Sequence, residues 1–231
     1  MNDVKDSVQR EIVVNASLEK VWDTLTKPEH LNKWYTKDAQ IDFRVGGRGY
    51  MNHGWGAETE GVYTEIDAMH YFVLQGEDGD FTTITTLEEV EEGIKVSIVY
   101  QASYIGKMQA AAKENMLFGT GQFLENLKSV YETGKDNRVN LWRTWIGIAH
   151  TTYNGEGTRV LQVKEGSTAA KAGILSNDVI TELDGEKIDG YESFERSLNE
   201  KSIGNTVTIE VQRNQQKQQL NCVVEQYPVS Y

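Results

Sequence analysis

A mostly polar segment without a hydrophobic period, residues 132–140, is the feature that most limits how this chain can fold. It follows a long helical pattern and precedes an apolar cluster at residues 141–146. Polar residues without a period, placed between two patterned regions, are typical of a loop between elements. Because 231 residues are enough for two small domains, we expect a domain boundary in this segment.

The charge balance argues against one class of partner. The net charge is -12, from 23 Lys and Arg residues against 35 Asp and Glu residues. The chain up to and including Arg138 holds 14 basic and 23 acidic residues, and the remainder holds 9 and 12, so both parts are acidic. Nucleic-acid binders gain most of their affinity by neutralising phosphates, and anionic membrane surfaces attract basic segments. We therefore expect no nucleic-acid partner.

Cysteine usage and hydropathy indicate the compartment. A single cysteine, Cys222, cannot form an internal disulfide, and residues 1–6 lack the apolar core of a signal peptide. No apolar run approaches the roughly 20 residues that a membrane-spanning helix needs. We expect a cytoplasmic protein without direct membrane insertion.

The first part of the chain reads as a sheet closed by a long helix. A strand pattern at residues 10–15 precedes a helical stripe that begins at the N-cap candidate Ser17, and Pro28 suits the first turn of a second short helix. Strand-like stretches follow at about 39–53, 58–67, 70–76, 81–90 and 94–104, and an amphipathic helical run covers 109–133. A sheet that buries such a helix against its concave face can enclose a cavity.

These residues resemble a known family. The resemblance is carried, in the same order, by residues 16–34, 42–47, 61–66 and 124–134. They are similar to the START-like (SRPBCC, helix-grip) superfamily, and more narrowly to bacterial homologues of the heat-shock-protein ATPase activator. The resemblance implies a curved antiparallel sheet around a long C-terminal helix, with a pocket for a hydrophobic small molecule. The superfamily includes both non-catalytic binders and cyclases, so this fold does not settle the function.

The second part alternates strands with two short helical segments. Strand patterns lie at 158–163, 178–185 and 206–213, an Ala-rich turn at 167–174, and a helix carries Tyr191, Phe194 and Leu198. This order resembles a PDZ domain, a small β-barrel or sandwich with two helices, of the kind found in bacterial high-temperature-requirement proteases. We therefore expect an α+β protein with a START-like domain at 8–135, a linker at 136–140 and a PDZ domain at 141–228.

The PDZ resemblance implies a peptide-binding site. A PDZ groove adds an extended C-terminal peptide to a sheet edge, and the N–H groups of a glycine loop receive the terminal carboxylate. By resemblance that loop is Trp145, Ile146, Gly147 and Ile148, with Arg143 favouring the carboxylate electrostatically. The opposite wall is the helix that bears Tyr191, Glu195 and Leu198. The partner expected here is a protein C-terminus with an apolar last residue.

In the first part, strand alternation and the closing helix supply candidates for the lining of a cavity. The candidates are Met51, His53, Trp55, Val96, Ile98, Tyr100, Met116, Thr120 and Phe123. His53 and Tyr100 are candidates for an acid–base pair, because histidine titrates near neutrality and a buried tyrosine hydroxyl seeks a partner. The alternative is that both are core or rim residues with satisfied hydrogen bonds.

The sequence carries no metal or cofactor signature. The four histidines lie far apart and Cys222 stands alone, whereas a metal site needs ligands at short spacing. Neither a Gly-x-Ser-x-Gly elbow nor a phosphate loop is present. The glycines at 46–49 fit strand bends better than a cofactor loop, because no helical pattern follows them. We expect neither metal nor cofactor.

Three functions remain open from the sequence. The absence of a clustered catalytic signature favours a non-enzymatic adaptor, whose first domain binds an apolar ligand or a protein client and whose PDZ domain binds a protein C-terminus. The second is a cyclase- or hydrolase-like enzyme localised by its PDZ domain. The third, implied by the family name, is a co-chaperone of a heat-shock ATPase. An acidic surface fits protein partners better than polyanions.

Overall fold

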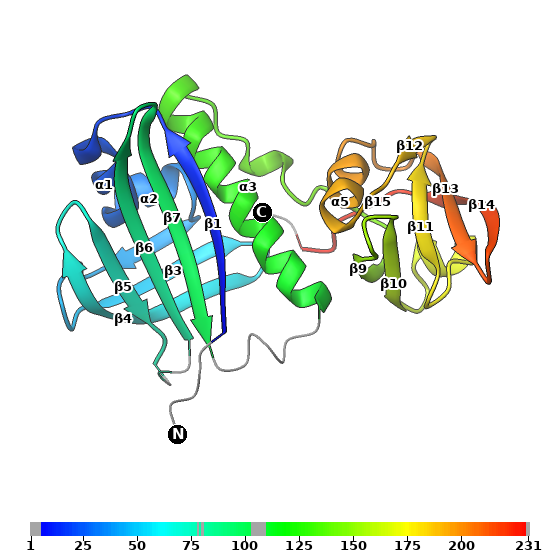
Figure 1. Cartoon of the computed structure of the whole chain (residues 1–231), viewed down its shortest axis with the longest axis horizontal. Helices are drawn as coiled ribbons and strands as arrows, with labels where there is room; N and C mark the ends of the chain where they lie inside the picture. Colours follow the sequence, from blue (N-terminus) through cyan, green and yellow to red (C-terminus); the bar gives the residue numbers. More distant parts are fainter. Residues whose placement is uncertain (1–5, 78, 80, 103–109, 230–231) are drawn as a thin grey trace. The chain divides into compact units, whose positions relative to one another are not determined.

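The computed structural model of the protein (Figure 1) describes residues 6–77, 79, 81–102 and 110–229. These residues form two compact units. The first unit holds the described residues up to 102 with 116–139, and the second holds 110–115 with 140–229. Each unit encloses its own hydrophobic core, as separate domains do.

The first unit is built on a seven-stranded antiparallel sheet with the order β1-β7-β6-β5-β4-β3-β2. Its strands are β1 (Asp6–Val14), β2 (Asp38–Ile41), β3 (Arg48–Gly54), β4 (Ala57–Asp67), β5 (Tyr71–Gln75), β6 (Phe81–Val90) and β7 (Gly93–Ala102). The register pairs Val8 with Tyr100 and Val14 with Ile94, so the first strand lies beside the last one. The inward-facing residues of β7 alternate with outward ones, as expected for a sheet with one covered face.

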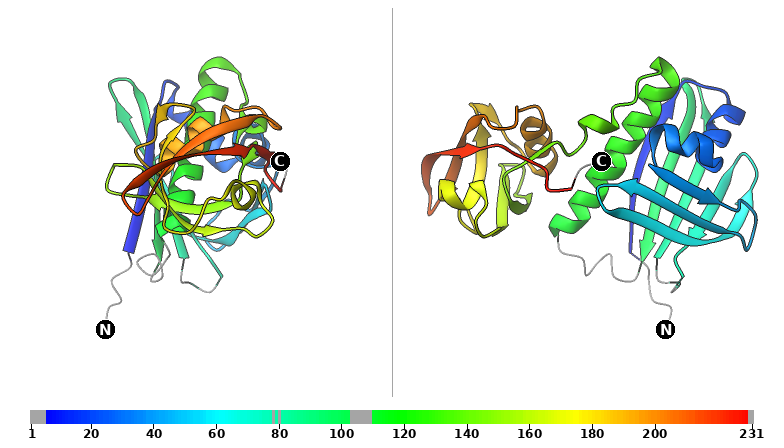
Figure 2. Two further views of the ribbon diagram at one scale, coloured as in Figure 1. Left: turned by 90° about the vertical axis from the view of Figure 1, so that its right-hand side faces the viewer. Right: turned by 180° about the vertical axis from the view of Figure 1, so that it is seen from behind.

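The helices of the first unit are α1 (Leu18–Thr26), α2 (Pro28–Trp34) and, from residue 116 onward, α3 (Ala110–Thr133). The Ser17 side chain caps α1 by accepting a hydrogen bond from the Lys20 N–H at 3.4 Å. Leu124 and Leu127 of α3 are buried in the core beneath the sheet. Figures 1 and 2 show the curved sheet with α3 along it. The expected curved antiparallel sheet with a long helix is thereby confirmed.

The prediction of one strand over residues 39–53 is wrong, because β2 and β3 are separated by residues 42–47. Gly46 has φ +80, and a Cβ at Gly47 would lie 2.0 Å from the carbonyl oxygen of Asp42. The Gly46 N–H donates to the Tyr63 carbonyl at 2.8 Å, which ties the turn to β4. The two glycines therefore allow a tight reversal that a continuous strand pattern does not reveal.

Residues 136–138 are bound closely to the first unit. Arg138 is the first residue of the 3₁₀ helix η2 (Arg138–Asn140). The guanidinium of Arg138 donates to the carbonyls of Thr36 at 2.6 Å and Asn32 at 2.9 Å, and pairs with Asp136 at 2.7 Å. The Asn137 N–H donates to the side-chain oxygen of Asn126 in α3 at 2.7 Å. The end of the first unit is therefore fixed by a buried polar cluster.

The second unit contains a six-stranded sheet with the order β14-β13-β11-β10-β9, in which β12 pairs with β11, and a two-stranded sheet of β8 and β15. The strands are β8 (Thr144–Trp145), β9 (Ile148–Thr152), β10 (Thr158–Val163), β11 (Val179–Leu183), β12 (Glu186–Lys187), β13 (Thr206–Arg213), β14 (Gln216–Val223) and β15 (Glu225–Gln226). The helices are α4 (Thr168–Ala172) and α5 (Tyr191–Asn199). The expected β-rich second domain is confirmed.

Helix ends and core residues explain the second unit's form. The Ser167 side chain caps α4 at its start, and Gly173, with φ +84, ends it. Phe194 and Leu198 of α5 are buried against the sheet residues of the same core. Strand β9 stands at one edge of the sheet, and its outer side is therefore not paired with another strand of that sheet. No helix among the described residues is long and apolar enough to cross a membrane.

Candidate functional site

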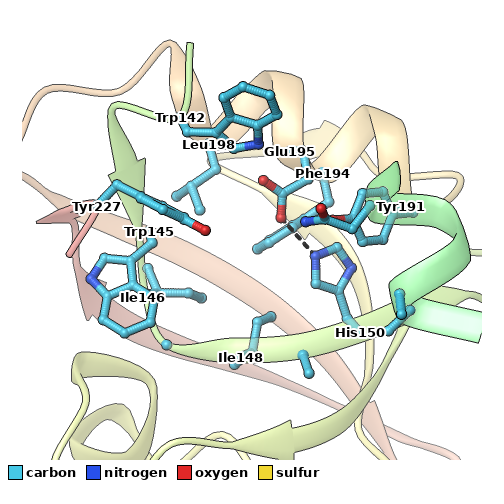
Figure 3. A pocket seen from close by; sticks show the side chains of 15 residues that line it. Trp142, Trp145, Ile146, Ile148, His150, Tyr191, Phe194, Glu195, Leu198 and Tyr227 are labelled. Atoms are coloured by element: carbon cyan, nitrogen blue, oxygen red, sulfur yellow. Dashed lines mark hydrogen bonds and ion pairs between the residues drawn. The ribbon is translucent and has the colours of Figure 1, made fainter. Parts of the chain in front are cut away.

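A groove in the second unit is lined by residues of β9 and of α5. Figure 3 shows its side chains. Apolar and aromatic residues form most of the lining, among them Trp142, Trp145, Ile146, Ile148, Phe194, Leu198 and Tyr227. His150, Tyr191 and Glu195 add polar groups. A concave, mostly apolar surface with a few convergent polar groups is typical of a binding site.

The loop from Trp145 to Ile148 forms one end of this groove. Gly147 has φ +88, and a Cβ there would lie 2.3 Å from the Cβ of Ser167. The Ala169 N–H donates to the Ile146 carbonyl at 3.0 Å, and the Lys164 N–H donates to the Gly147 carbonyl at 2.8 Å. The carbonyls of Ile146 and Gly147 are thus satisfied from inside the unit, and glycine is the residue that fits this backbone conformation without overlap.

The open side of β9 begins directly after this loop. Ile148 lies opposite Val163 in the register with β10. Because Lys164 donates to the Gly147 carbonyl, Ile148 and Val163 form a non-hydrogen-bonded pair, in which the N–H and C=O of each residue point away from the other strand. The Ile148 N–H therefore faces the open edge, where an added strand would meet it.

Helix α5 supplies the opposite wall. Tyr191, Glu195 and Leu198 stand four and three residues apart, so they share one face of the helix. His150 of β9 joins the two walls: its Nε2 lies 2.8 Å from Glu195 Oε1, and its Nδ1 lies 2.7 Å from Thr158 Oγ1. The Tyr191 ring stacks on the His150 ring at 4.4 Å between centroids. The imidazole is buried, whereas the Glu195 side chain is 22% exposed to the groove.

Two cationic side chains, Arg143 and Lys164, lie near the loop in the sequence or the sheet, and they make different contacts. Arg143 does not line the groove; its guanidinium donates to the carbonyl of Lys201 at 3.3 Å, and its N–H donates to Asn199 Oδ1 at 2.8 Å. The Nζ of Lys164 lies 4.9 Å from the centroid of the Trp145 ring. Lys164 is therefore a cation held beside the loop by its contact with the ring of Trp145.

The cavity candidates of the first unit lie in or around its core. Met51, His53, Val96, Ile98, Tyr100 and Thr120 are buried, whereas Trp55, Met116 and Phe123 are half-buried. The Phe123 ring packs at 6.0 Å from His53 and at 6.1 Å from Trp55, between centroids. Strand β3, the turn after it and helix α3 therefore place part of this set together.

Tyr35 stands between the two acid–base candidates, His53 and Tyr100. Its ring lies 4.4 Å from the His53 ring, and its side chain and that of Tyr100 influence the pKa of each other. Tyr100 also lies 3.1 Å from Thr120 Oγ1, and His53 Nε2 lies 2.9 Å from Thr59 Oγ1. No direct hydrogen bond joins His53 to Tyr100 among the bonds of the described residues.

Burial controls the ionisation of this cluster. It lowers the pKa of His53 from 6.5 to about 4, with a small opposing effect from the Tyr35 backbone. It raises the pKa of Tyr100 and, more strongly, that of Tyr35. All three side chains are therefore neutral near pH 7. Within the described part of the chain, no group of three histidine, cysteine or acidic side chains is arranged to hold a metal ion.

Comparison with known proteins matches a family model to each part of the chain. A family model described as activator of Hsp90 ATPase homolog 1-like protein (AHSA1) matches residues 15–132, slightly more than half of the chain. The chain belongs to this family. In this AHSA1-like protein a PDZ family model matches residues 135–224. The chain therefore consists of an AHSA1-like domain followed by a PDZ domain.

Individual relatives match one of the two domains. The serine protease Do-like HtrA of Lactobacillus helveticus is 40% identical over 58 residues, which are 25% of the AHSA1-like protein and 14% of the protease. The chain thus spans a small part of that relative's length. Among solved structures, the Aha1 dimer from Colwellia psychrerythraea is 23% identical with a TM-score of 0.49, over 56% of this chain and 98% of that one. The AHSA1-like protein from Aeromonas hydrophila is 19% identical with a TM-score of 0.45, over 56% and 94%.

Several groove residues of the PDZ domain do not follow from the sequence patterns. Trp142 and Tyr227 reach the groove from opposite ends of the domain sequence. Lys164 does not line the groove, but the pairing of β9 with β10 brings it beside the loop. Of these residues, His150 is the one that the sequence could have placed in the groove. It stands two residues after Ile148 and so shares a strand face with it.

Acid is expected to destabilise the AHSA1-like domain through His53. The unfolded chain binds a proton near pH 6.5 and the folded domain only near pH 4, so this contribution is present above pH 6.5 and is lost as the pH falls toward 4. The loss amounts to at most about 3 kcal/mol. Urea unfolding of wild type and His53→Gln across that interval checks it, and the variant is expected to lose less free energy of unfolding on acidification.

The exposed His70 provides the control for this experiment. His70→Gln is expected to follow the wild-type pH dependence. If His53→Gln and wild type lose the same free energy of unfolding between pH 6.5 and 4, the assignment of the effect to His53 is wrong.

Proposed function

We propose that this protein is a non-enzymatic adaptor with two binding domains. The PDZ domain takes the C-terminus of a partner protein, and the AHSA1-like domain binds a hydrophobic small molecule or a protein client. The observation that carries the proposal is the loop at 145–148 beside the open edge of β9. Gly147 lets the loop backbone pack against Ser167 at a positive φ, and the carbonyls of Ile146 and Gly147 are already occupied from inside the unit.

The unpaired edge of β9 determines the proposed mode of binding. A peptide adds to β9 as a further strand, and its terminal carboxylate meets the N–H groups of Ile146, Gly147 and Ile148. The last side chain enters the apolar part of the groove near Ile148 and Leu198. Lys164 adds a favourable charge near the carboxylate, a role that the sequence had suggested for Arg143.

For the AHSA1-like domain, the chemistry of its interior supports binding rather than catalysis. The cluster of Tyr35, His53 and Tyr100 is buried and uncharged near neutrality. A histidine with a pKa of about 4 is a weak general base at that pH, which disfavours the cyclase- or hydrolase-like alternative. Aromatic rings around a few hydrogen-bonding groups suit an apolar, uncharged molecule.

A co-chaperone role is the second candidate function. The observation that favours it is the match over residues 15–132 to a family described by activation of the Hsp90 ATPase. In that case the protein client of the AHSA1-like domain is a heat-shock ATPase, and the PDZ domain recruits a second protein. The cytoplasm is the proposed compartment for both functions, consistent with a single cysteine, Cys222, that is buried and unpaired.

Native mass spectrometry of the full chain, purified from its own host, tests the proposal. Two pools of hexapeptides with random sequences and an apolar last residue are added, one as free acids and one as amides. The free-acid pool is expected to bind at least about tenfold more tightly, because the carboxylate is the recognised group. A small molecule retained before peptide addition identifies the ligand of the AHSA1-like domain. Equal binding of both pools contradicts the proposed recognition of a C-terminal carboxylate.

A further inference from the structure

The groove holds one acidic side chain whose position bears on which peptides it accepts. Glu195 is the only carboxylate among the described residues that line the groove. Its Oε1 accepts a hydrogen bond from His150 at 2.8 Å, and no hydrogen bond to Oε2 is present in the described part of the chain. Figure 3 shows this carboxylate above His150, among the aromatic side chains of the groove.

The surroundings of Glu195 favour a cation. Phe194, Leu198 and Trp142 make this part of the groove apolar, so an uncompensated negative charge is costly there once a peptide excludes water. The imidazole of His150 donates one hydrogen bond to Oε1, and this donor does not fill the capacity of a carboxylate to accept hydrogen bonds. The Trp142 and Tyr191 rings also line the groove, and aromatic faces attract ammonium and guanidinium groups.

The helix geometry indicates which peptide residue meets Glu195. An α-helix rises 1.5 Å per residue along its axis. Measured along the axis of α5 from Leu198, Glu195 is therefore about 4.5 Å away and Tyr191 is about 10.5 Å away. In an added strand, the residue two places before the end lies about 7 Å from the last one and points to the same side. With the last side chain at Leu198, that residue falls between Glu195 and Tyr191.

We propose that Glu195 is a specificity-determining residue that selects a C-terminal peptide with a lysine or arginine side chain two residues before its end. This inference rests on the proposed function of the PDZ domain. The long-range electrostatics agree with it. The net charge of the chain is -12, so a basic tail is attracted before it docks.

The test divides the free-acid hexapeptide pool by the residue two places before the end, which is Lys, Gln, Ser or Glu. Affinities for the full-length protein are measured by fluorescence anisotropy. The Lys pool is expected to bind about tenfold more tightly than the Gln pool and to exceed the Glu pool by more. Glu195→Gln keeps an acceptor for His150 and removes the charge, so it is expected to abolish the preference for the Lys pool over the Gln pool.

Glu192→Gln is the matched control, because Glu192 lies on the same helix, pairs with Arg196 at 3.0 Å and does not line the groove. It is expected to keep the preference for Lys. Equal affinity for the Lys and Gln pools, a preference for Ser, or a preference for Lys that survives in Glu195→Gln overturns the inference. If the free-acid and amide forms of every pool bind equally, the proposed function itself fails. If free acids bind without a preference for Lys, only the role of Glu195 fails.

Discussion

Replacing Gly147 with alanine is expected to reduce peptide affinity at least about thirtyfold, the loss that defines an interface hot spot. A Cβ at this position would lie 2.3 Å from the Cβ of Ser167, and the backbone has φ +88. The loop must shift to accommodate the methyl group, and its N–H groups then no longer point at a common anion. Fluorescence anisotropy with the free-acid peptide pool measures the loss.

Gly155→Ala is the matched control for this prediction. Gly155 also has a positive φ, +70, but a Cβ there would meet no atom within 4 Å. The control is expected to cost about 1 kcal/mol of stability and to leave affinity unchanged. Adding Ser167→Gly to Gly147→Ala removes the overlap and is expected to restore part of the affinity. A folded Gly147→Ala protein with wild-type affinity would show that the loop does not hold the peptide.

Arg138→Met is expected to destabilise the AHSA1-like domain by about 3–4 kcal/mol. The Arg138 side chain is buried, and its removal takes the guanidinium donors from the carbonyls of Thr36 and Asn32 and the paired cation from the Asp136 carboxylate. Leaving a buried polar group unpaired destabilises a protein by more than a typical hydrogen bond stabilises it. Differential scanning calorimetry is expected to show one transition lowered by roughly 10 °C, with the PDZ transition unchanged.

The control is Arg44→Met, which removes an exposed ion pair with Asp42. Side-chain exposures of 68% and 53% predict a cost below about 0.5 kcal/mol. If Arg138→Met costs as little as this control, the segment after α3 is a loose connection, and the polar cluster around Arg138 does not stabilise the domain.

Local signals in the sequence predict much of the fold. Ser17 and Pro28 mark the starts of α1 and α2, and the alternation over 206–213 gives β13. These features depend on near neighbours in the chain, so one sequence is enough to find them. The family resemblance then supplies the order and the closure of the elements.

The last hairpin shows where such reasoning ends. Strand β14 follows a turn at Asn214 and Gln215, which have φ values of 51° and 66°. Position 215 is a glutamine and not the glycine that usually marks such a turn. The strand also begins with polar residues on an exposed edge. Its pairing with β13 therefore gives no clear hydrophobic alternation to predict it.

The candidate site has the same limit. The glycine loop and the α5 face are visible in the sequence, because each is a short local motif. The link from His150 to Glu195 joins residues 45 positions apart, and Lys164 contacts Trp145 from the position directly after β10. Such contacts depend on the sheet register and helix placement, which local patterns do not fix.

The central claim is that the loop at 145–148 receives a peptide C-terminus. Its most direct test is an NMR titration of the full-length protein with the free-acid peptide pool, followed at the backbone amides. The account predicts the largest, saturable shifts at Ile146, Gly147 and Ile148, and none of comparable size with the amide pool. Saturable binding that leaves these three amides unmoved would contradict it.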